Sequence, residues 1–496
     1  MTDSKGATPA PAPARWRKYA FLNLTPAQYF VRLIPAIVYG FYMYSSRGPF
    51  QPASCTGFGL HCPMATNHIT GVLERPEYYG QVLGYYTNLI AQAEDLGGSL
   101  AVFVDGQAAV EGIIIARLVD QGKLDYEAKI VEYWPEFGQN GKENVRLRDL
   151  MVHESGVPAL DDEDKLDVLS WASQGDEEKF SERLARQPHA FGGKPTRAYH
   201  GITRGWFLNE IVKRVDHKGR TIGQIAQQDL MTDYEDLELY YAKLPKESDW
   251  EDRLSPMHDY PLLRLFGRLV LPQAVLNSKV FGYPHLLPLH RIVKKSFESK
   301  SLTAKALMPK FAPWPHLFRT PEAHVYEGTS FSLKTNAHSL ARLMSMMANK
   351  GGATRPGEPD LISPAVYTQA TTLHGTAVCE VTGETFPLSV GGWVKTRDFY
   401  GEGPLKGVEV QGWAGAGGSM IMWIEELGIG FSYVTNAFAA PETLLGDFRG
   451  KTLLDRVVYA RKGELGLLPK KKATTPEGGA DVGAGAEAQA AAEEKK

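Results

Sequence analysis

The chain has 496 residues, of which 43% are apolar, and this is ample for one large core or two entwined lobes. The net charge of −3 gives no sign of a nucleic-acid partner, and no basic stripe is visible in the central region. Three cysteines are too few for a disulfide framework, and they form no Cys-x-x-Cys metal pair. Cys55 and Cys62 form either a short loop disulfide or two free thiols, depending on the compartment.

The two ends of the chain have compositions that differ from the central part. Residues 1–28 are basic and are expected to be disordered, and residues 47–70 are expected to be a linker. Residues 463–496 are rich in Ala, Gly, Glu and Lys and almost lack large apolar side chains. Because such a segment cannot bury enough surface to offset the entropy of ordering, we expect a disordered tail.

An apolar and aromatic segment at residues 29–46, interrupted by Arg32, lies between the basic end and the linker. A bilayer span needs roughly 20 apolar residues, and this run is shorter. Three interpretations remain open: an uncleaved signal-anchor, an organelle-targeting segment, or an amphipathic helix on a membrane or on the main domain. We expect association with a membrane.

The main domain is expected over residues 71–462, and it begins with a strand and a buried helix. The run GGSLAVFVDG at residues 97–106 is typical of a strand. The run VEGIIIARLVDQGKL at residues 110–124 has helical spacing, with Gly122 as its stop. This helix is apolar on most sides, so it should occupy the centre of the core.

Helices and loops dominate the middle of the domain, and strands return at its end. Residues 230–323 are predicted to be a helical insertion. Two strand-like runs, at residues 412–426 and 428–438, are separated by a hairpin at Leu427-Gly428. Strands at both ends with helices between them predict an α+β fold, with an antiparallel sheet built from the N- and C-terminal segments and flanked by helices.

Three stretches of the domain carry a family resemblance. They are LVDQGKLDYEAKIVEYWPEFGQNGKENVRLRDLMVHESGVP (residues 118–158), AYHGITRGWFLNEIVKRV (198–215) and GWAGAGGSMIMWIEELGIGFSYVTNAF (412–438). Together they resemble the serine β-lactamase-like superfamily, which includes class C β-lactamases, penicillin-binding proteins, carboxylesterases and animal β-lactamase-like proteins. The resemblance extends over most of the chain and implies a β-lactamase/transpeptidase-like fold with an inserted helical lobe.

The resemblance also implies a chemistry. In this superfamily a serine attacks an acyl carbonyl, and water hydrolyses the acyl-enzyme that results. The serine belongs to a Ser-x-x-Lys turn at the start of the central helix, and the lysine helps to activate it. A tyrosine shares the proton transfer, and two backbone N–H groups stabilise the oxyanion.

The resemblance assigns roles to residues that this chain retains. Tyr199 falls on the acid/base tyrosine, and the N–H of Ala416 falls on the strand-side oxyanion donor. The positions assigned to substrate binding are His200, Trp413, Ala414 and Gly415. His153 is expected to be structural, at a helix end near the core. No histidine spacing indicates a metal site, and no cofactor is expected.

The nucleophile itself is missing from the expected place. Counting back from the helix puts the family's lysine on Ala108 and its serine on Asp105, and neither residue has the necessary chemistry. No serine in the chain has a lysine three residues later. Ser296, Ser301 and Ser330 have a lysine four residues later, in parts of the fold that do not suit the motif. The strand is joined directly to the helix body, and two strands of the sheet should be absent.

The leading hypothesis is a β-lactamase-related hydrolase fold that is inactive or very weakly active as an esterase. The alternatives are a binding or scaffold protein that reuses the cleft, a shortened isoform of an active carboxylesterase, and a hydrolase with an unrecognised nucleophile. The expected ligand is a small acyl ester or amide, and homo-oligomer formation stays open. Fold alone does not specify the substrate.

Overall fold

A computed structural model describes the greater part of the domain. The described residues are 73–91, 98–104, 110–160, 177–241, 255, 258–259, 302–307, 327–330, 332–399, 403–415, 417–438, 446 and 448–468. The expectations for residues 1–70, including the membrane segment and the two cysteines of the linker, lie outside these ranges, as does most of the predicted insertion. Among the described residues, no helix is both long and apolar enough to cross a bilayer.

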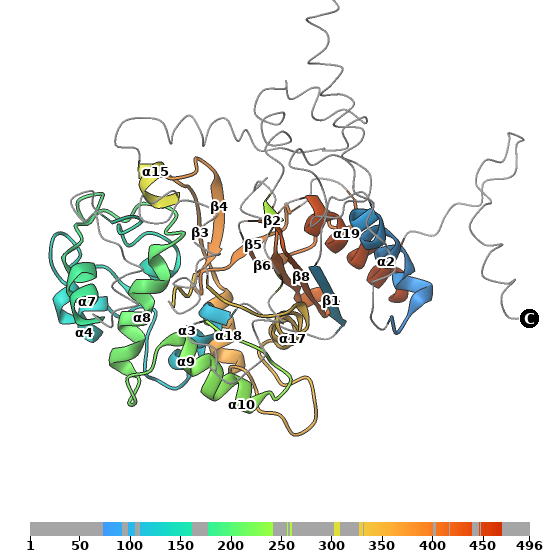
Figure 1. Cartoon of the computed structure of the whole chain (residues 1–496), viewed down its shortest axis with the longest axis horizontal. Helices are drawn as coiled ribbons and strands as arrows, with labels where there is room; N and C mark the ends of the chain where they lie inside the picture. The colour runs from blue at the N-terminus through green and yellow to red at the C-terminus, as the bar shows by residue number, and fades with distance from the viewer. Residues whose placement is uncertain are drawn as a thin grey trace, which may run out of the picture.

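The centre of the fold is a seven-stranded antiparallel sheet in the order β1-β8-β7-β6-β5-β4-β3 (Figure 1). Its strands are β1 (Gly98–Val104), β3 (Leu373–Val378), β4 (Thr385–Ser389), β5 (Val394–Thr396), β6 (Val410–Ala414), β7 (Met420–Ile424) and β8 (Ile429–Thr435). A second, two-stranded sheet pairs β2 (His258–Asp259) with β9 (Ala437–Phe438) in parallel. The N-terminal strand thus joins a sheet that is otherwise C-terminal, which confirms the predicted α+β class.

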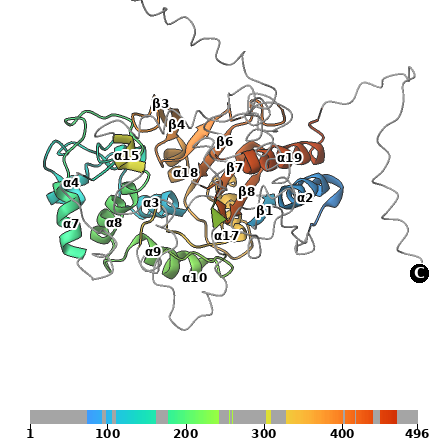
Figure 2. The ribbon, with the colours of Figure 1, turned by 45° about the horizontal axis from the view of Figure 1, so that its top comes forward.

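Helices cover the sheet and form a separate lobe. They are α2 (Pro76–Ala91), α3 (Val110–Asp120), α4 (Ile130–Tyr133), η3 (Pro135–Phe137), α5 (Leu147–Met151), α7 (Glu177–Arg186), α8 (Thr203–Val215), α9 (Ile222–Ile225), η4 (Ala226–Leu230), α10 (Met231–Asp233), α15 (Leu302–Leu307), α17 (Ala337–Ala348), α18 (Pro364–Thr371), η6 (Glu425–Leu427) and α19 (Phe448–Glu464). Figures 1 and 2 place α2 and α19 side by side at one end of the molecule and α4, α7 and α8 together at the other.

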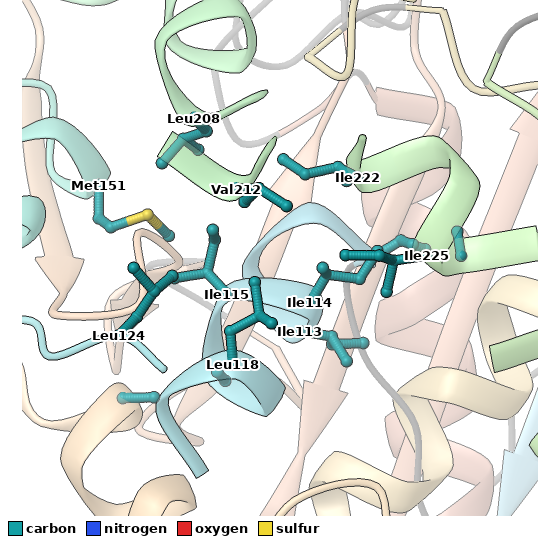
Figure 3. Close-up of a cluster of buried hydrophobic side chains, with 14 of the residues drawn as sticks. Ile113, Ile114, Ile115, Leu118, Leu124, Met151, Leu208, Val212, Ile222 and Ile225 are labelled. Carbon is teal, nitrogen blue, oxygen red and sulfur yellow. The ribbon is translucent and has the colours of Figure 1, made fainter. Parts of the chain in front are cut away.

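The predicted central helix is present as α3, and its burial is complete over most of its length. Ile113, Ile114 and Ile115 are all fully buried, together with Leu118 at the end of the apolar run. Figure 3 shows these side chains surrounded by apolar residues of α5, α8 and α9 and of the loop that follows α3. Gly122 has φ = +69°, so the helix stops where the sequence predicts.

The run at residues 412–426 forms two strands rather than one, which corrects the expectation from the sequence. Within this run, β6 ends at Ala414 and β7 begins at Met420. Gly417 (φ = +99°) and Gly418 (φ = +109°) have backbone conformations that only glycine adopts readily, so they make the turn between the strands. The second predicted run does form β8, after the left-handed Gly428 (φ = +60°).

The end of the domain lies slightly beyond the predicted boundary at residue 462. Helix α19 continues to Glu464, whose carboxylate forms an ion pair with Arg461 and accepts a hydrogen bond from the hydroxyl of Tyr79 in α2. These contacts tie the last turn of α19 to the N-terminal helix, so this turn belongs to the domain.

The two faces of the sheet pack against different helices because strand side chains alternate. Phe431 and Tyr433 of β8 belong to the core that α2 and α19 complete. Gly430, between them, faces α17 on the opposite side. A Cβ atom at this glycine would lie 2.6 Å from the backbone nitrogen of Ser345, so α17 approaches the sheet too closely for any side chain.

We predict that Gly430→Ala lowers the free energy of unfolding by about 1–3 kcal/mol, since α17 must shift to admit the methyl group. Gly84→Ala is the matched control, because Gly84 is exposed in α2 with open space around it, and alanine favours a helix. Urea denaturation of the three proteins checks the difference. Equal midpoints for Gly430→Ala and the wild type would contradict the close approach of α17.

Candidate functional site

Four rings from three parts of the chain form an aromatic cluster, which comprises His153, Tyr199, His200 and Trp413. His153 follows α5 with φ = +64°, the tyrosine and the second histidine precede α8, and the tryptophan is in β6. The ring centroid of His153 lies 4.9 Å from that of Tyr199 and 5.8 Å from that of Trp413. The structure therefore brings together the two most distinctive residues of the predicted site.

Tyr199 and Trp413 stack with 6.0 Å between centroids and 25° between planes. Both side chains are only half-buried, so part of this stacked surface is open to solvent. Burial raises the pKa of the Tyr199 phenol, while the charge of Arg204 and a hydrogen bond from Trp413 act in the opposite direction. The phenol is consequently protonated at neutral pH and can donate a hydrogen bond.

His200 is fully buried, and the protein itself occupies both of its ring nitrogens. Nδ1 donates to the carbonyl oxygen of Ala198, so Nε2 is an acceptor. Nε2 receives the hydroxyl of Ser155 at 2.9 Å and the N–H of Val157 at 3.1 Å. This geometry makes His200 the support of the turn after α5 and leaves no ring nitrogen free for a ligand.

The β6 end of the site is divided between two faces of the sheet. Trp413 packs near Tyr199, whereas the side chain of Ala414 belongs to the core on the α19 side. The N–H of Gly415 donates to the carbonyl of Ser419 at 2.8 Å and so closes the β6–β7 turn. Ala416, the predicted oxyanion donor, lies outside the described residues.

A buried ion pair beneath the aromatic cluster was not predicted from the sequence. Glu111, in the first turn of α3, accepts a hydrogen bond from Arg204 Nε at 3.1 Å. The guanidinium also lies over the Trp413 ring, 5.8 Å from its centroid. The sequence features that could have indicated this ion pair are a glutamate at the start of an otherwise apolar helix and an arginine one helical turn after the YHG motif. Buried charges require partners, and each of these residues needs one.

Ser330 and Lys334, a near miss for the Ser-x-x-Lys spacing, do not contact one another through their side chains. The Ser330 hydroxyl donates to Glu111 Oε2 at 3.4 Å and accepts the N–H of Gly205. Lys334 Nζ donates to the carbonyl oxygens of Ser332 and Tyr241, and burial lowers its pKa to about 8. Ser330 and Lys334 therefore do not form a hydrogen-bonded serine–lysine pair.

The junction between β1 and α3 is short. β1 ends at Val104 and α3 begins at Val110, so residues 105–109 are the whole connection, and they contain neither serine nor lysine. In the part of the sheet that the structure describes, β1 is the terminal strand and pairs only with β8. Within the described ranges, no group of three or more His, Cys, Asp or Glu side chains is arranged to hold a metal ion.

The sheet, the flanking helices and the tyrosine beside the β6 strand define a class: the β-lactamase and penicillin-binding-protein fold. The chain matches the Beta-lactamase family over residues 109–454, most of its length. It therefore belongs to the beta-lactamase family.

One curated relative is the esterase/beta-lactamase LipL of Mycobacterium tuberculosis. It is 33% identical over 153 residues, which cover 25% of this chain. The chain spans only 34% of LipL in this match, so the match relates parts of the two proteins.

Solved structures share the fold over a longer stretch. A penicillin-binding protein homologue from Caulobacter crescentus (23% identity) and a family VIII carboxylesterase (18% identity) each give a TM-score of 0.60. In both cases 79% of this chain and 99% of the other are covered. EstA from Arthrobacter nitroguajacolicus Rue61a gives 0.57 at 20% identity, covering 80% of this chain and 99% of EstA. These likenesses establish the architecture, which agrees with the fold predicted from the sequence.

We predict a pH-dependent loss of stability that originates at His200. Burial lowers its pKa to about 3, against an ordinary value of about 6.5, so the folded state holds the neutral ring. Its contribution is fully present above pH 6.5 and is lost as the pH falls toward 3, because only the unfolded chain gains the proton. Between pH 7.5 and pH 5 the wild type should lose about 2 kcal/mol more unfolding free energy than His200→Gln.

Urea titrations at the two pH values measure this difference. The control is His217→Gln, at an exposed histidine, which should lose as much stability as the wild type. If the wild type and His200→Gln lost the same unfolding free energy between the two pH values, His200 would not be held neutral in the folded state.

Proposed function

We propose that this chain binds small acyl ligands on the surface around Tyr199 and Trp413 and lacks the acyl-serine chemistry of the beta-lactamase family. The observation that carries the proposal is the connection between β1 and α3. Five residues, Asp105 to Ala109, replace the segment that holds the Ser-x-x-Lys turn in relatives, and none of them supplies a hydroxyl or an amine side chain. Without an activated nucleophile, no acyl-enzyme forms.

Ser155 is the first described serine with a basic partner, and its position argues against catalysis. Its hydroxyl donates to His200 Nε2, as a nucleophile does in a Ser-His pair. The side chain is fully buried, however, and His200 already accepts a second hydrogen bond. With its pKa lowered to about 3, His200 is too weak a base to remove a serine proton at neutral pH.

Ser330 is another serine whose hydroxyl faces an acceptor side chain, since it donates to the buried carboxylate of Glu111. That carboxylate is already paired with Arg204, whose Nε lies 3.1 Å from Oε1. The Ser330 oxygen is also occupied as the acceptor of the Gly205 N–H. We therefore expect Ser330 to be unreactive.

The ligand class follows from what remains. The half-buried stacked rings offer an apolar surface with a protonated phenol at its edge, which suits an acyl group with a carbonyl oxygen. The name of LipL, an esterase/beta-lactamase, supports acyl compounds as ligands. Binding and the remaining hydrogen-bond donors give a weak residual hydrolysis, of the kind that other hydrolases retain without their nucleophile at roughly 10³–10⁴-fold over water.

A fluorophosphonate probe tests the proposal, because it labels only activated serines. The purified full-length chain should remain unlabelled and should hydrolyse p-nitrophenyl butyrate only slowly. Ser155→Ala and Ser330→Ala are the matched variants, each removing one serine that has a basic or acidic partner.

Labelling that disappears in either serine variant would identify a working nucleophile and overturn the proposal. Fast ester turnover that Tyr199→Phe abolishes would do the same. Rates that are equal in the wild type and all three variants support a chain without serine chemistry.

The second candidate is a shortened form of an active carboxylesterase. It is favoured by the family match, which begins at residue 109, the last residue of the short connection. Sequencing transcripts across the codons of Gln107 and Ala108 distinguishes the two. Reads with an additional exon at this point support the shortened form, and uninterrupted reads alone support a chain that functions as it stands.

A further inference from the structure

The ring of His153 faces hydrogen-bond donors on both of its nitrogens. The backbone N–H of His200 points to Nδ1 at 3.1 Å, and Arg204 Nη1 lies 3.3 Å from Nε2. Both are groups that can only donate. A neutral imidazole has one nitrogen that accepts and one that carries a proton, so it can satisfy only one of these donors.

The surroundings decide which nitrogen accepts. The His200 N–H has no other acceptor among the described residues, so it requires the lone pair of Nδ1. Arg204 has two further acceptors, since Nε donates to Glu111 and Nη1 donates to the carbonyl of Met151 at 3.2 Å. The His153 proton is therefore assigned to Nε2, which then faces the guanidinium donor to donor.

The ring cannot relieve this opposition by changing its charge. His153 is 2% exposed, and burial lowers its pKa well below the ordinary value, with the charge of Arg204 adding to the effect. A second proton would leave the His200 N–H without its acceptor. An Nε2–H and a guanidinium N–H thus lie side by side in a buried place and, among the described residues, the Nε2–H has no acceptor.

The Tyr199 hydroxyl is a third donor, on a ring that packs against the His153 ring. The two rings meet edge-on with 4.9 Å between their centroids, and burial raises the pKa of the phenol, so its hydroxyl keeps a proton to donate at neutral pH. Three donors exceed the two lone pairs of a carbonyl oxygen. A carboxylate, with about four lone-pair positions on two oxygens, can satisfy all of them.

We propose that His153 Nε2–H, Arg204 Nη1–H and Tyr199 O–H bind the carboxylate of a small acid, whose aromatic or apolar body lies on the stacked Tyr199 and Trp413 rings. This inference rests on the proposed function in that it names the ligand class of the same surface. The bound species is a free acid rather than an ester, so no bond is made or broken.

The first test measures the tautomer of His153 in the full-length chain, labelled with ¹⁵N-histidine. The ring should be neutral with its proton on Nε2, and benzoate should shift that N–H signal. A proton on Nδ1, or a charged ring at pH 7.5, would overturn the proposal, and neither measurement depends on a variant that must fold.

The second test compares binding of benzoate and benzamide by calorimetry. We expect benzamide to bind at least about tenfold more weakly than benzoate, because it is uncharged and brings its own N–H donors to the site. In His153→Asn, asparagine tolerates the left-handed backbone at this position, and its side-chain carbonyl can accept the His200 N–H. It lacks a donor at the Nε2 position. This variant should bind benzoate about tenfold more weakly than the wild type and should bind benzamide with unchanged affinity.

Equal binding of the two ligands, or benzoate affinity that His153→Asn does not change, would overturn the carboxylate site. The fluorophosphonate result is independent of these measurements. Labelling would overturn the proposed lack of serine chemistry without affecting the tautomer, and an unlabelled chain that does not bind benzoate would overturn the carboxylate site alone.

Discussion

Burial of the first two turns of α3 on every side is the constraint on which the arrangement of the domain depends. The first seven residues of this eleven-residue helix are all buried, including three successive isoleucines, so other elements must enclose them. Helices α5, α8 and α9 do so on the lobe side, and α18 packs against it as well. Enclosure fixes the position of α8 and therefore of the YHG motif immediately before it.

The same burial explains the charged layer beneath the aromatic cluster. Glu111 enters the core with the first turn of α3, and a carboxylate in that position requires a cation and hydrogen-bond donors. Arg204 meets this requirement and, being held by Glu111 and Met151, is kept beside His153 and Trp413. The Glu111–Arg204 ion pair therefore compensates the buried carboxylate and also places a cationic donor beside the rings of His153 and Trp413.

Several features of the fold could be predicted because they depend on local patterns. The spacing of apolar residues identifies β1 and α3, and Gly122 and Gly428 mark ends where the backbone turns left-handed. The division of residues 412–426 into β6 and β7 was missed, since the glycines of the turn leave the apolar pattern on both sides intact. The role of His153 was predicted in part: its placement near the core is correct, but its ring lies against Tyr199 and Trp413.

The sequence by itself determined the class of fold, the absence of a Ser-x-x-Lys motif and the residues of the tyrosine and β6 motifs, because these depend on composition and on order along the chain. Tertiary structure alone decided which atoms of those motifs meet. His200 turns its nitrogens toward Ser155 and Val157, whereas Arg204 and His153 bring donors together beside Tyr199. The physical reason is that buried polar groups must find hydrogen-bond partners, and here those partners are many residues apart in the sequence. Only the packing around α3 brings them within reach of one another.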